Sequence, residues 1–278
     1  MEDLLDLIGE TAPYARLFGV TSKDDVVLCW FKPEQQRHAE TTLMSCSEGM
    51  RAMGVMGALV GASANPSKAC RHYYLGLHAD FRAFPIEATD SEVFQCVGRL
   101  EKVRRSKLGP IYQVSGACLT DRGERYAEME GALLGLTEEE FVNFKGRDTA
   151  APAPWTPDMP SPYVDPVRTL DVQWLEPGRK LRTTLPGFRR EDFAGHFGIR
   201  PLCPVSMLSA NACSLVSHFS GYEKHWISRC TLVCEDVVAA EQEQRLTCVQ
   251  EDGGRFSVHV ESGEGRSLAQ FKIDAMRV

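Results

Sequence analysis

Hydrophobic and polar positions divide the chain into short strand-like segments and two long apolar segments. Residues 26–31 read VVLCWF, a run of β-branched and aromatic residues that predicts a strand. Residues 42–62 are rich in Met, Ala and Gly and carry almost no charge, which predicts a helix buried nearly all round. Further strands are predicted at residues 72–77, 93–102, 111–119 and 126–134.

The second half of the chain repeats this order of segments. Strands are predicted at residues 169–175 and 180–185, and an apolar helical segment follows at residues 204–219. The last strands are predicted at residues 225–234, 245–250, 256–260 and 267–276. Two consecutive meanders, each wrapping one buried helix, predict an α+β fold built in duplicate.

A proline-rich segment separates the two halves. Six of the fifteen prolines fall within residues 146–166, where neither a helix nor the interior of a sheet can form. A chain of 278 residues is also close to the length at which one core usually divides into two. We therefore expect an N-terminal domain at residues 1–145, a stiff linker at 146–166 and a C-terminal domain at 167–278.

Composition narrows the classes of partner. With 43% hydrophobic and 25% charged residues the chain is typical of a globular protein, and its net charge of -7 offers no general attraction for nucleic acid or an anionic membrane. The N-terminal sequence lacks a secretory signal, and no apolar run reaches the length of a membrane span, so we expect a cytoplasmic protein. Its ten cysteines form no CxxC pair, which favours buried free thiols and no metal site.

Residues 175–205 carry an ordered set of short motifs. These are Glu176-Pro177-Gly178, Phe193-Ala194-Gly195-His196-Phe197, Arg200-Pro201 and Pro204. In this order they resemble the β-hydroxyacyl-acyl-carrier-protein dehydratases of the hotdog fold, over roughly the last 110 residues. The first half looks like a looser copy. The resemblance implies a double hotdog, with two antiparallel sheets that each wrap a long central helix and join as an internal pseudo-dimer. A monomer would suffice, and a homodimer of such chains is also possible.

Dehydration of a β-hydroxyacyl thioester needs a base, an acid and hydrogen-bond donors for the thioester oxygen. By resemblance the base is His196, and the donors lie at the N-terminus of the helix that Pro204 opens. Val205 stands where the family has glycine. The other residues that the resemblance places around the substrate are Gly195, Phe197 and Asn211.

The family's acid lies fourteen residues beyond its histidine, which here is Ala210. The dimeric family draws its histidine from one hotdog and its carboxyl from the other, so the resemblance implies one composite site in which Glu48 of the first half serves His196. The reciprocal site, which would face Ala210, would be inactive. An alternative stays open, because Ser45-x-x-Glu48 also reads as a capping box whose helix begins at Ser45 rather than near Thr41.

Other chemically capable residues favour structural roles. His38 precedes the first helix without the family's motif and is expected in a loop, and Cys46 and Ser47 beside Glu48 are expected to pack or cap the helix rather than attack a thioester. His72 and His78, which flank a strand, are expected at core or surface positions. Basic clusters at residues 102–107, 179–182 and 189–190 could receive an acidic carrier or coenzyme A, although solvated strand edges explain them slightly better.

The resemblance therefore implies a hydro-lyase for β-hydroxyacyl thioesters, without metal or redox cofactor. Its substrate would be linked to acyl carrier protein or coenzyme A, as in fatty-acid or polyketide assembly. Two alternatives remain open from the sequence. One is a hotdog thioesterase or acyltransferase, and the other is a non-catalytic protein that holds an acyl chain or a partner.

Overall fold

The computed structural model describes residues 4–65, 70–86, 91–147, 155–168 and 171–278. The first half contains a short 3-10 helix (Leu4–Leu7), β1 (Leu17–Lys23), β2 (Val26–Phe31), α1 (Cys46–Ala64), β3 (His72–Ala83), β4 (Phe94–Arg105), β5 (Pro110–Thr120), β6 (Arg125–Thr137) and α2 (Glu138–Lys145). The second half contains β7 (Val172–Glu176), β8 (Lys180–Leu185), α3 (Val205–Ser214), β9 (His225–Cys234), β10 (Gln244–Gln250), β11 (Arg255–Ser262), β12 (Ser267–Arg277) and 3-10 helices at Arg190–Phe193 and Leu215–His218.

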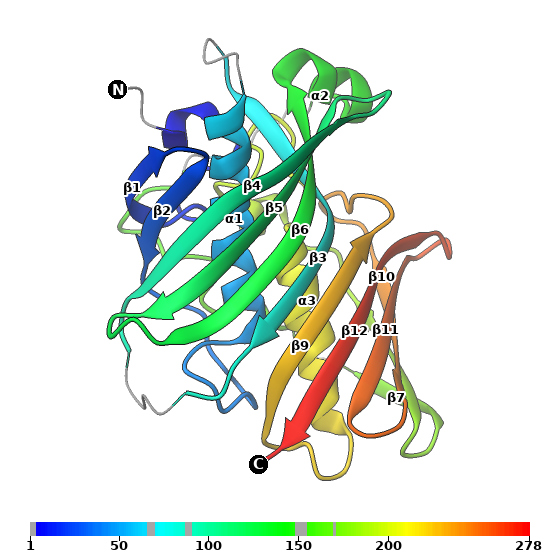
Figure 1. Cartoon of the computed structure of the whole chain (residues 1–278). Coiled ribbons are helices and arrows are strands. Elements are labelled where there is room, and N and C mark those ends of the chain that lie inside the picture. The colour runs from blue at the N-terminus through cyan, green and yellow to red at the C-terminus, as the bar shows by residue number, and fades with distance from the viewer. Residues whose placement is uncertain (1–3, 66–69, 87–90, 148–154, 169–170) are drawn as a thin grey trace.

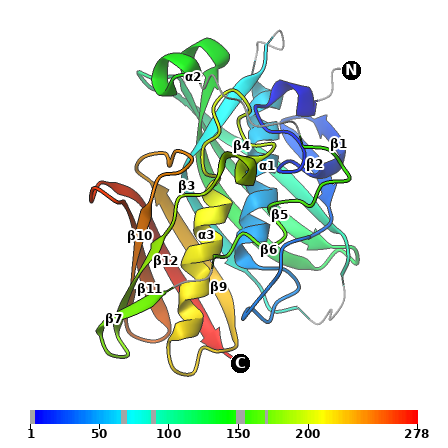
Figure 2. The same ribbon diagram turned by 180° about the vertical axis from the view of Figure 1, so that it is seen from behind.

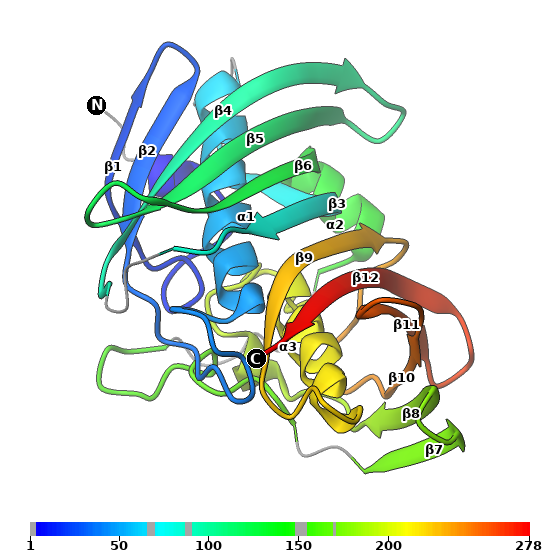
Figure 3. The same cartoon turned by 60° about the horizontal axis from the view of Figure 1, so that its bottom comes forward.

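In the described residues all strands belong to one continuous antiparallel sheet, to which both halves of the chain contribute. Its order is β1-β2-β4-β5-β6-β3-β9-β12-β11-β10-β8-β7, so each half supplies six neighbouring strands. The halves meet where β3 pairs with β9, in a register that runs from His78 with Val233 to Arg82 with Arg229. The sheet curls over both helices (Figures 1 and 3), and the helices lie side by side on its concave face (Figure 2).

Helix α1 is buried on almost every side, as its uniformly apolar sequence predicts. Glycines on the strands let it approach closely: a Cβ added at Gly98 would lie 1.7 Å from the Met56 sulfur, and one at Gly116 would lie 2.4 Å from the Met56 methyl carbon. Its start differs from the family register, because the Ser45 hydroxyl accepts a hydrogen bond from Glu48 N at 3.3 Å and caps a helix that begins at Cys46. Glu48 therefore lies in the first turn, not the second.

The described part of the proline-rich segment packs against both halves. Tyr163 is buried and its hydroxyl donates to Ala194 O at 2.9 Å, just before the predicted base. On the other side Gln36 N donates to Val164 O at 2.8 Å, in the loop that precedes α1. This segment therefore fixes the two loops that lead into the central helices. No helix within the described residues is long and apolar enough to cross a bilayer.

Candidate active site

A cavity of about 130 Å³ lies between the two halves. It exists because β3 begins at His72 but pairs with β9 only from His78 to Arg82. Beyond this short ladder the strands separate, and the exposed Gly76 and the half-buried Asp236 lie on opposite sides of the opening. The junction of the two hotdog-like halves thus leaves room for a ligand.

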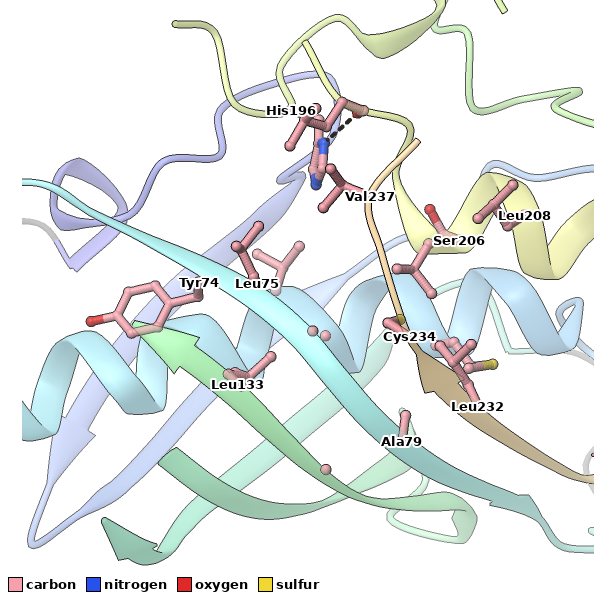
Figure 4. A pocket seen from close by; sticks show the side chains of 18 of the residues that line it. Tyr74, Leu75, Ala79, Leu133, His196, Ser206, Leu208, Leu232, Cys234 and Val237 are labelled. Atoms are coloured by element: carbon pink, nitrogen blue, oxygen red, sulfur yellow. Dashed lines mark hydrogen bonds between the residues drawn. The ribbon is translucent and has the colours of Figure 1, made fainter. Parts of the chain in front are cut away.

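The walls of this cavity are mainly apolar (Figure 4). Both central helices contribute, as do strands on either side of the junction. The apolar lining includes Met50, Val55, Leu75, Val114, Met129, Leu133, Leu208, Leu232 and Val238. Its volume is close to that of an engineered cavity of about 150 Å³ that accepts benzene, so an alkyl segment can occupy it.

His196 lies in the cavity wall as a neutral imidazole. Its Nδ1 donates to Leu202 O at 2.9 Å, which orients the ring and leaves Nε2 as the basic nitrogen (Figure 4). The residue is only 8% exposed, and this burial lowers the pKa of His196 to about 4 despite the carbonyl contact, which raises it. At neutral pH the ring can accept a proton.

Glu10 is the buried carboxyl that lines the same cavity. It is 4% exposed, and in the described part of the chain nothing hydrogen-bonds to its Oε2. Desolvation raises the pKa of Glu10 to about 8, against the weaker opposing effects of a hydrogen bond from its own backbone and of the Arg71 charge. The carboxyl is therefore protonated at neutral pH, with a proton that it can donate.

One backbone hydrogen bond joins the segments that carry these two side chains. Thr11 N donates to Gly195 O at 2.7 Å, and these residues directly follow Glu10 and precede His196. Gly195 has φ +78°, and a Cβ there would lie 2.4 Å from Thr11 O, so only glycine permits this close approach. Tyr14 completes the contact, because its ring packs edge-on against the His196 ring with centroids 4.7 Å apart.

The N-terminus of α3 adds donors to the cavity. Pro204 is the N-cap, and Val205 and Ser206, the first two residues of the helix, line the cavity. The first N–H groups of a helix have no partner within it, so those of Val205 and Ser206 can bind an oxygen that gains negative charge. The Ser206 hydroxyl is also buried in this part of the wall.

The substrate residues expected from the sequence lie in three different settings. Val205 and Phe197 line the cavity with His196, whereas Gly195 and Pro204 shape the backbone beside it. Asn211 is fully buried and does not line this cavity. Its amide is held within the protein, since Oδ1 accepts from Arg168 N at 2.9 Å and Nδ2 donates to Pro166 O at 3.0 Å.

Glu48 is not among the residues that line this cavity. It is fully buried, and its Oε2 and Oε1 accept from Arg51 Nε and Nη2 at 3.0 and 2.9 Å. Its Oε1 also accepts from Glu34 N at 3.0 Å, and Arg51 in turn reaches Tyr14 O at 3.4 Å. The carboxylate therefore holds Arg51 in place and ties α1 to the backbone at Glu34.

A second cavity, of about 170 Å³, is lined by Ala210 and His38. Ala210 is the position that the inactive reciprocal site was expected to face, whereas His38 was expected only in a loop. His38 Nε2 contacts Asp165 Oδ1 at 3.0 Å, in the proline-rich segment. Glu40 and His225 line the same cavity, so its walls are more polar than those of the first.

The remaining candidates have structural surroundings. Cys46 and Ser47 are buried in the first turn of α1, and the Ser47 hydroxyl accepts from Gln35 Nε2 at 2.5 Å. His72 is buried and contacts Cys70 O at 3.1 Å, whereas His78 is exposed and lies at the opening of the first cavity. The basic cluster at residues 102–107 is exposed where β4 leads into β5.

Sequence reasoning did not identify Glu10, Tyr14 or Ser206. Glu10 belongs to no motif, and its role depends on packing against a loop of the other half. A weak signal was available, because Glu10 follows the apolar residues Leu7 and Ile8 after a single glycine. Such a group is expected to be buried, where desolvation favours its protonated form.

No protein-family model matches the sequence, and no curated protein matches it significantly. Among solved structures it resembles an acyl-ACP thioesterase from Bacteroides thetaiotaomicron (TM-score 0.57, 11% identity, 91% of this chain and 98% of that one). It also resembles a 12:0-ACP thioesterase from Umbellularia californica (TM-score 0.53, 12% identity, 93% and 100%). A third similar structure is the peroxisomal multifunctional enzyme type 2 from Drosophila melanogaster (TM-score 0.54, 10% identity, 91% of this chain and 48% of that one). These similarities establish the hotdog fold.

Proposed function

We propose that the chain dehydrates a β-hydroxyacyl thioester at one composite site between its halves, with His196 as base and Glu10 as acid. The observation that carries the proposal is the opposite displacement of two pKa values in one cavity, to about 4 for His196 and to about 8 for Glu10. Pairs of titratable groups whose environments separate their pKa values in this way are typical of acid and base partners.

In the proposed reaction the C2–H and C3–O bonds break and a C2=C3 double bond forms. His196 Nε2 takes the C2 proton, because Nδ1 is committed to Leu202 O. Glu10 gives its proton to the departing C3 hydroxyl, which leaves as water. The negative charge that develops on the thioester oxygen is stabilised by the N–H groups of Val205 and Ser206. Return of the proton from His196 to Glu10 restores the starting state, and the same steps in reverse hydrate the double bond.

The acyl chain would occupy the apolar part of the cavity, and its thioester arm would enter between β3 and β9. Two cations lie close to this opening, because Lys145 and Arg266 both pair with Asp236, at 3.2 and 2.9 Å, and one carboxylate balances only one of the two charges. The tip formed by β4 and β5, which carries the basic cluster, lies beside α2 (Figure 1). We propose an acyl carrier protein or coenzyme A as the carrier, since both are anionic.

Thioester hydrolysis would require a different protonation state of Glu10. A carboxylate that activates water must be ionised, whereas desolvation keeps Glu10 protonated below about pH 8. Dehydration uses the protonated form directly, and it is the reaction that we favour for this reason.

The test is to incubate the full chain with 3-hydroxyacyl thioesters of acyl carrier protein and of coenzyme A. Formation of the 2-enoyl thioester, seen as a new conjugated absorption and a mass loss of one water, is the expected result. Release of free thiol without alkene would instead assign a thioesterase. Saturable binding with neither product would contradict catalysis.

A further inference from the structure

We propose that Cys46, Cys213 and Cys230 bind one Zn²⁺ ion between the two halves of the chain. Cys46 is the first residue of α1, Cys213 lies near the end of α3, and Cys230 lies within β9. Their sulfur atoms all lie within 4.8 Å of one another, and each residue is at most 3% exposed. This inference is independent of the proposed dehydration, which uses none of these residues.

The spacing of the sulfurs is close to that of a zinc site. Zn–S bonds of about 2.3 Å in a tetrahedron place the sulfurs about 3.8 Å apart. Adjustments of about 1 Å or less per sulfur pair, within the reach of side-chain rotation, would bring the thiols onto a common ion. The sequence gives no hint of this site, because the three cysteines lie far apart along the chain and no short motif joins them.

The second cavity supplies both a route for the ion and a fourth ligand. Cys213 lines this cavity together with Glu40 and His225. Glu40 adjoins the cluster directly, because its Oε2 accepts from Cys46 N at 2.8 Å. Carboxylate oxygens, imidazole nitrogens and water are all ordinary zinc ligands, so a movement of the Glu40 or His225 side chain toward the sulfurs, or a water in the cavity, would complete the tetrahedron.

His225 is oriented as a zinc-binding histidine would be. It is 1% exposed, and its Nδ1 donates to Tyr222 O at 2.8 Å. Zinc-bound histidines commonly donate their second nitrogen to a carbonyl in this way, which leaves the other nitrogen free to bind the ion. His225 Nε2 is buried and has no hydrogen-bond partner in the described residues. A buried nitrogen of this kind is costly unless something binds it.

Other cysteines provide a contrast within the same fold. Cys29, Cys96 and Cys118 also lie side by side, on the neighbouring strands β2, β4 and β5. They line neither of the two cavities, and among the described residues they do not form a group that could hold a metal ion. These three thiols fit the role of small apolar core residues. The cluster at Cys46 differs from them because it adjoins a cavity with a carboxylate and a histidine in its wall.

The experiment measures metal binding by the full chain, without an affinity tag that binds metal. The protein is reduced, stripped with a chelator, reconstituted with ZnCl₂ and desalted, and its zinc is measured by inductively coupled plasma mass spectrometry. We expect one Zn²⁺ per chain and a higher Tm with the ion. Reconstitution with CoCl₂ should give intense thiolate-to-cobalt absorption in the near ultraviolet, a signature of sulfur ligation that needs no variant.

Substitutions then assign the site. Cys213→Ser and Cys230→Ser should each lose bound zinc and the cobalt absorption, whereas Cys248→Ser, which changes an equally buried thiol outside the cluster, should keep both. Circular dichroism checks that each variant is folded. A wild-type chain that retains no zinc and gives no thiolate–cobalt absorption overturns the proposal, as does equal loss of zinc in the Cys248 variant.

Discussion

Glu10 and His196 come from opposite halves of the chain and are held together by the hydrogen bond from Thr11 N to Gly195 O. Burial acts on both side chains and displaces their pKa values in opposite directions, so that each is uncharged at neutral pH. Elimination of water requires such a pair, an uncharged base and an uncharged acid that act on one substrate.

Glu10→Gln should reduce dehydration by about 10²- to 10⁴-fold, the usual contribution of one acid catalyst, because an amide cannot replace the donated proton. His196→Asn should cause a loss of the same order. Glu48→Gln is the matched control, since it alters a buried carboxyl of the same half that does not line the cavity. We expect lower stability but near-normal turnover per folded molecule, measured as kcat with the folded fraction determined by circular dichroism. An active Glu10→Gln protein with an inactive Glu48→Gln protein would transfer the acid role to Glu48.

The pH dependence of kcat/KM should be bell-shaped. Dehydration needs His196 neutral and Glu10 protonated, so activity should fall below about pH 4 and above about pH 8. In Glu10→Gln the residual activity should lose its alkaline limb and keep its acid limb. Initial rates from pH 3 to 10 with a mixed buffer at constant ionic strength provide the measurement. A rate that instead rises through pH 8 would show that ionised Glu10 is the active form, as in hydrolysis.

Glu10 should also make the folded state less stable as pH rises. Its pKa is raised from 4.5 to about 8 in the folded chain, so between these values the folded state binds a proton that the unfolded state has lost. Stability is therefore greatest below about pH 4.5 for this group and falls by roughly 1.4 kcal/mol per pH unit until about pH 8.

Glu10→Gln removes this titration. The variant should be more stable than the wild type at pH 7.5, and the difference between them should shrink toward pH 5. Urea unfolding at several pH values measures the free energy of unfolding of each protein. A difference that does not change with pH would mean that Glu10 is ionised in the folded state.

The sequence predicted most of the fold because apolar patterns report burial directly. The run at residues 42–62 gave the central helix to within a few residues, and the Gly195-His196-Phe197 motif led to the histidine in the cavity. β1 was missed because only its first residue is buried, which leaves no alternating pattern to detect. α2 was also missed, although Thr137 and Glu140 form a capping box before an acidic first turn.

The partners of the site residues depend on tertiary packing, which a local pattern does not contain. Glu48 and Glu10 are both acidic residues in apolar surroundings, and only the fold shows that Arg51 binds one while the other lines the cavity beside His196. Cys46 likewise lies far from Cys213 and Cys230 in the sequence, although the three side chains meet in the core.

Gly54 should accept a methyl group without steric strain. It lies in the interior of α1 and lines the cavity, and a Cβ added there would meet no atom within 4 Å. Gly54→Ala should therefore stabilise the protein by up to about 1 kcal/mol, the difference in helix propensity between the two residues. Gly61→Ala is the contrasting control, because its Cβ would lie 2.5 Å from the Tyr74 ring and should cost stability. Thermal unfolding compares the two variants.

A larger side chain at this position should shorten the accepted substrate. Gly54→Leu would place its side chain in the space where the acyl chain is proposed to lie, while His196 and Glu10 remain unchanged. We expect kcat/KM for long-chain 3-hydroxyacyl thioesters to fall at least tenfold, with short-chain substrates turned over at nearly the wild-type rate. A series of substrates of increasing chain length measures this change in specificity. If kcat/KM fell by the same factor for every chain length, the acyl chain would not pass Gly54, and another route from the opening between β3 and β9 would have to hold it.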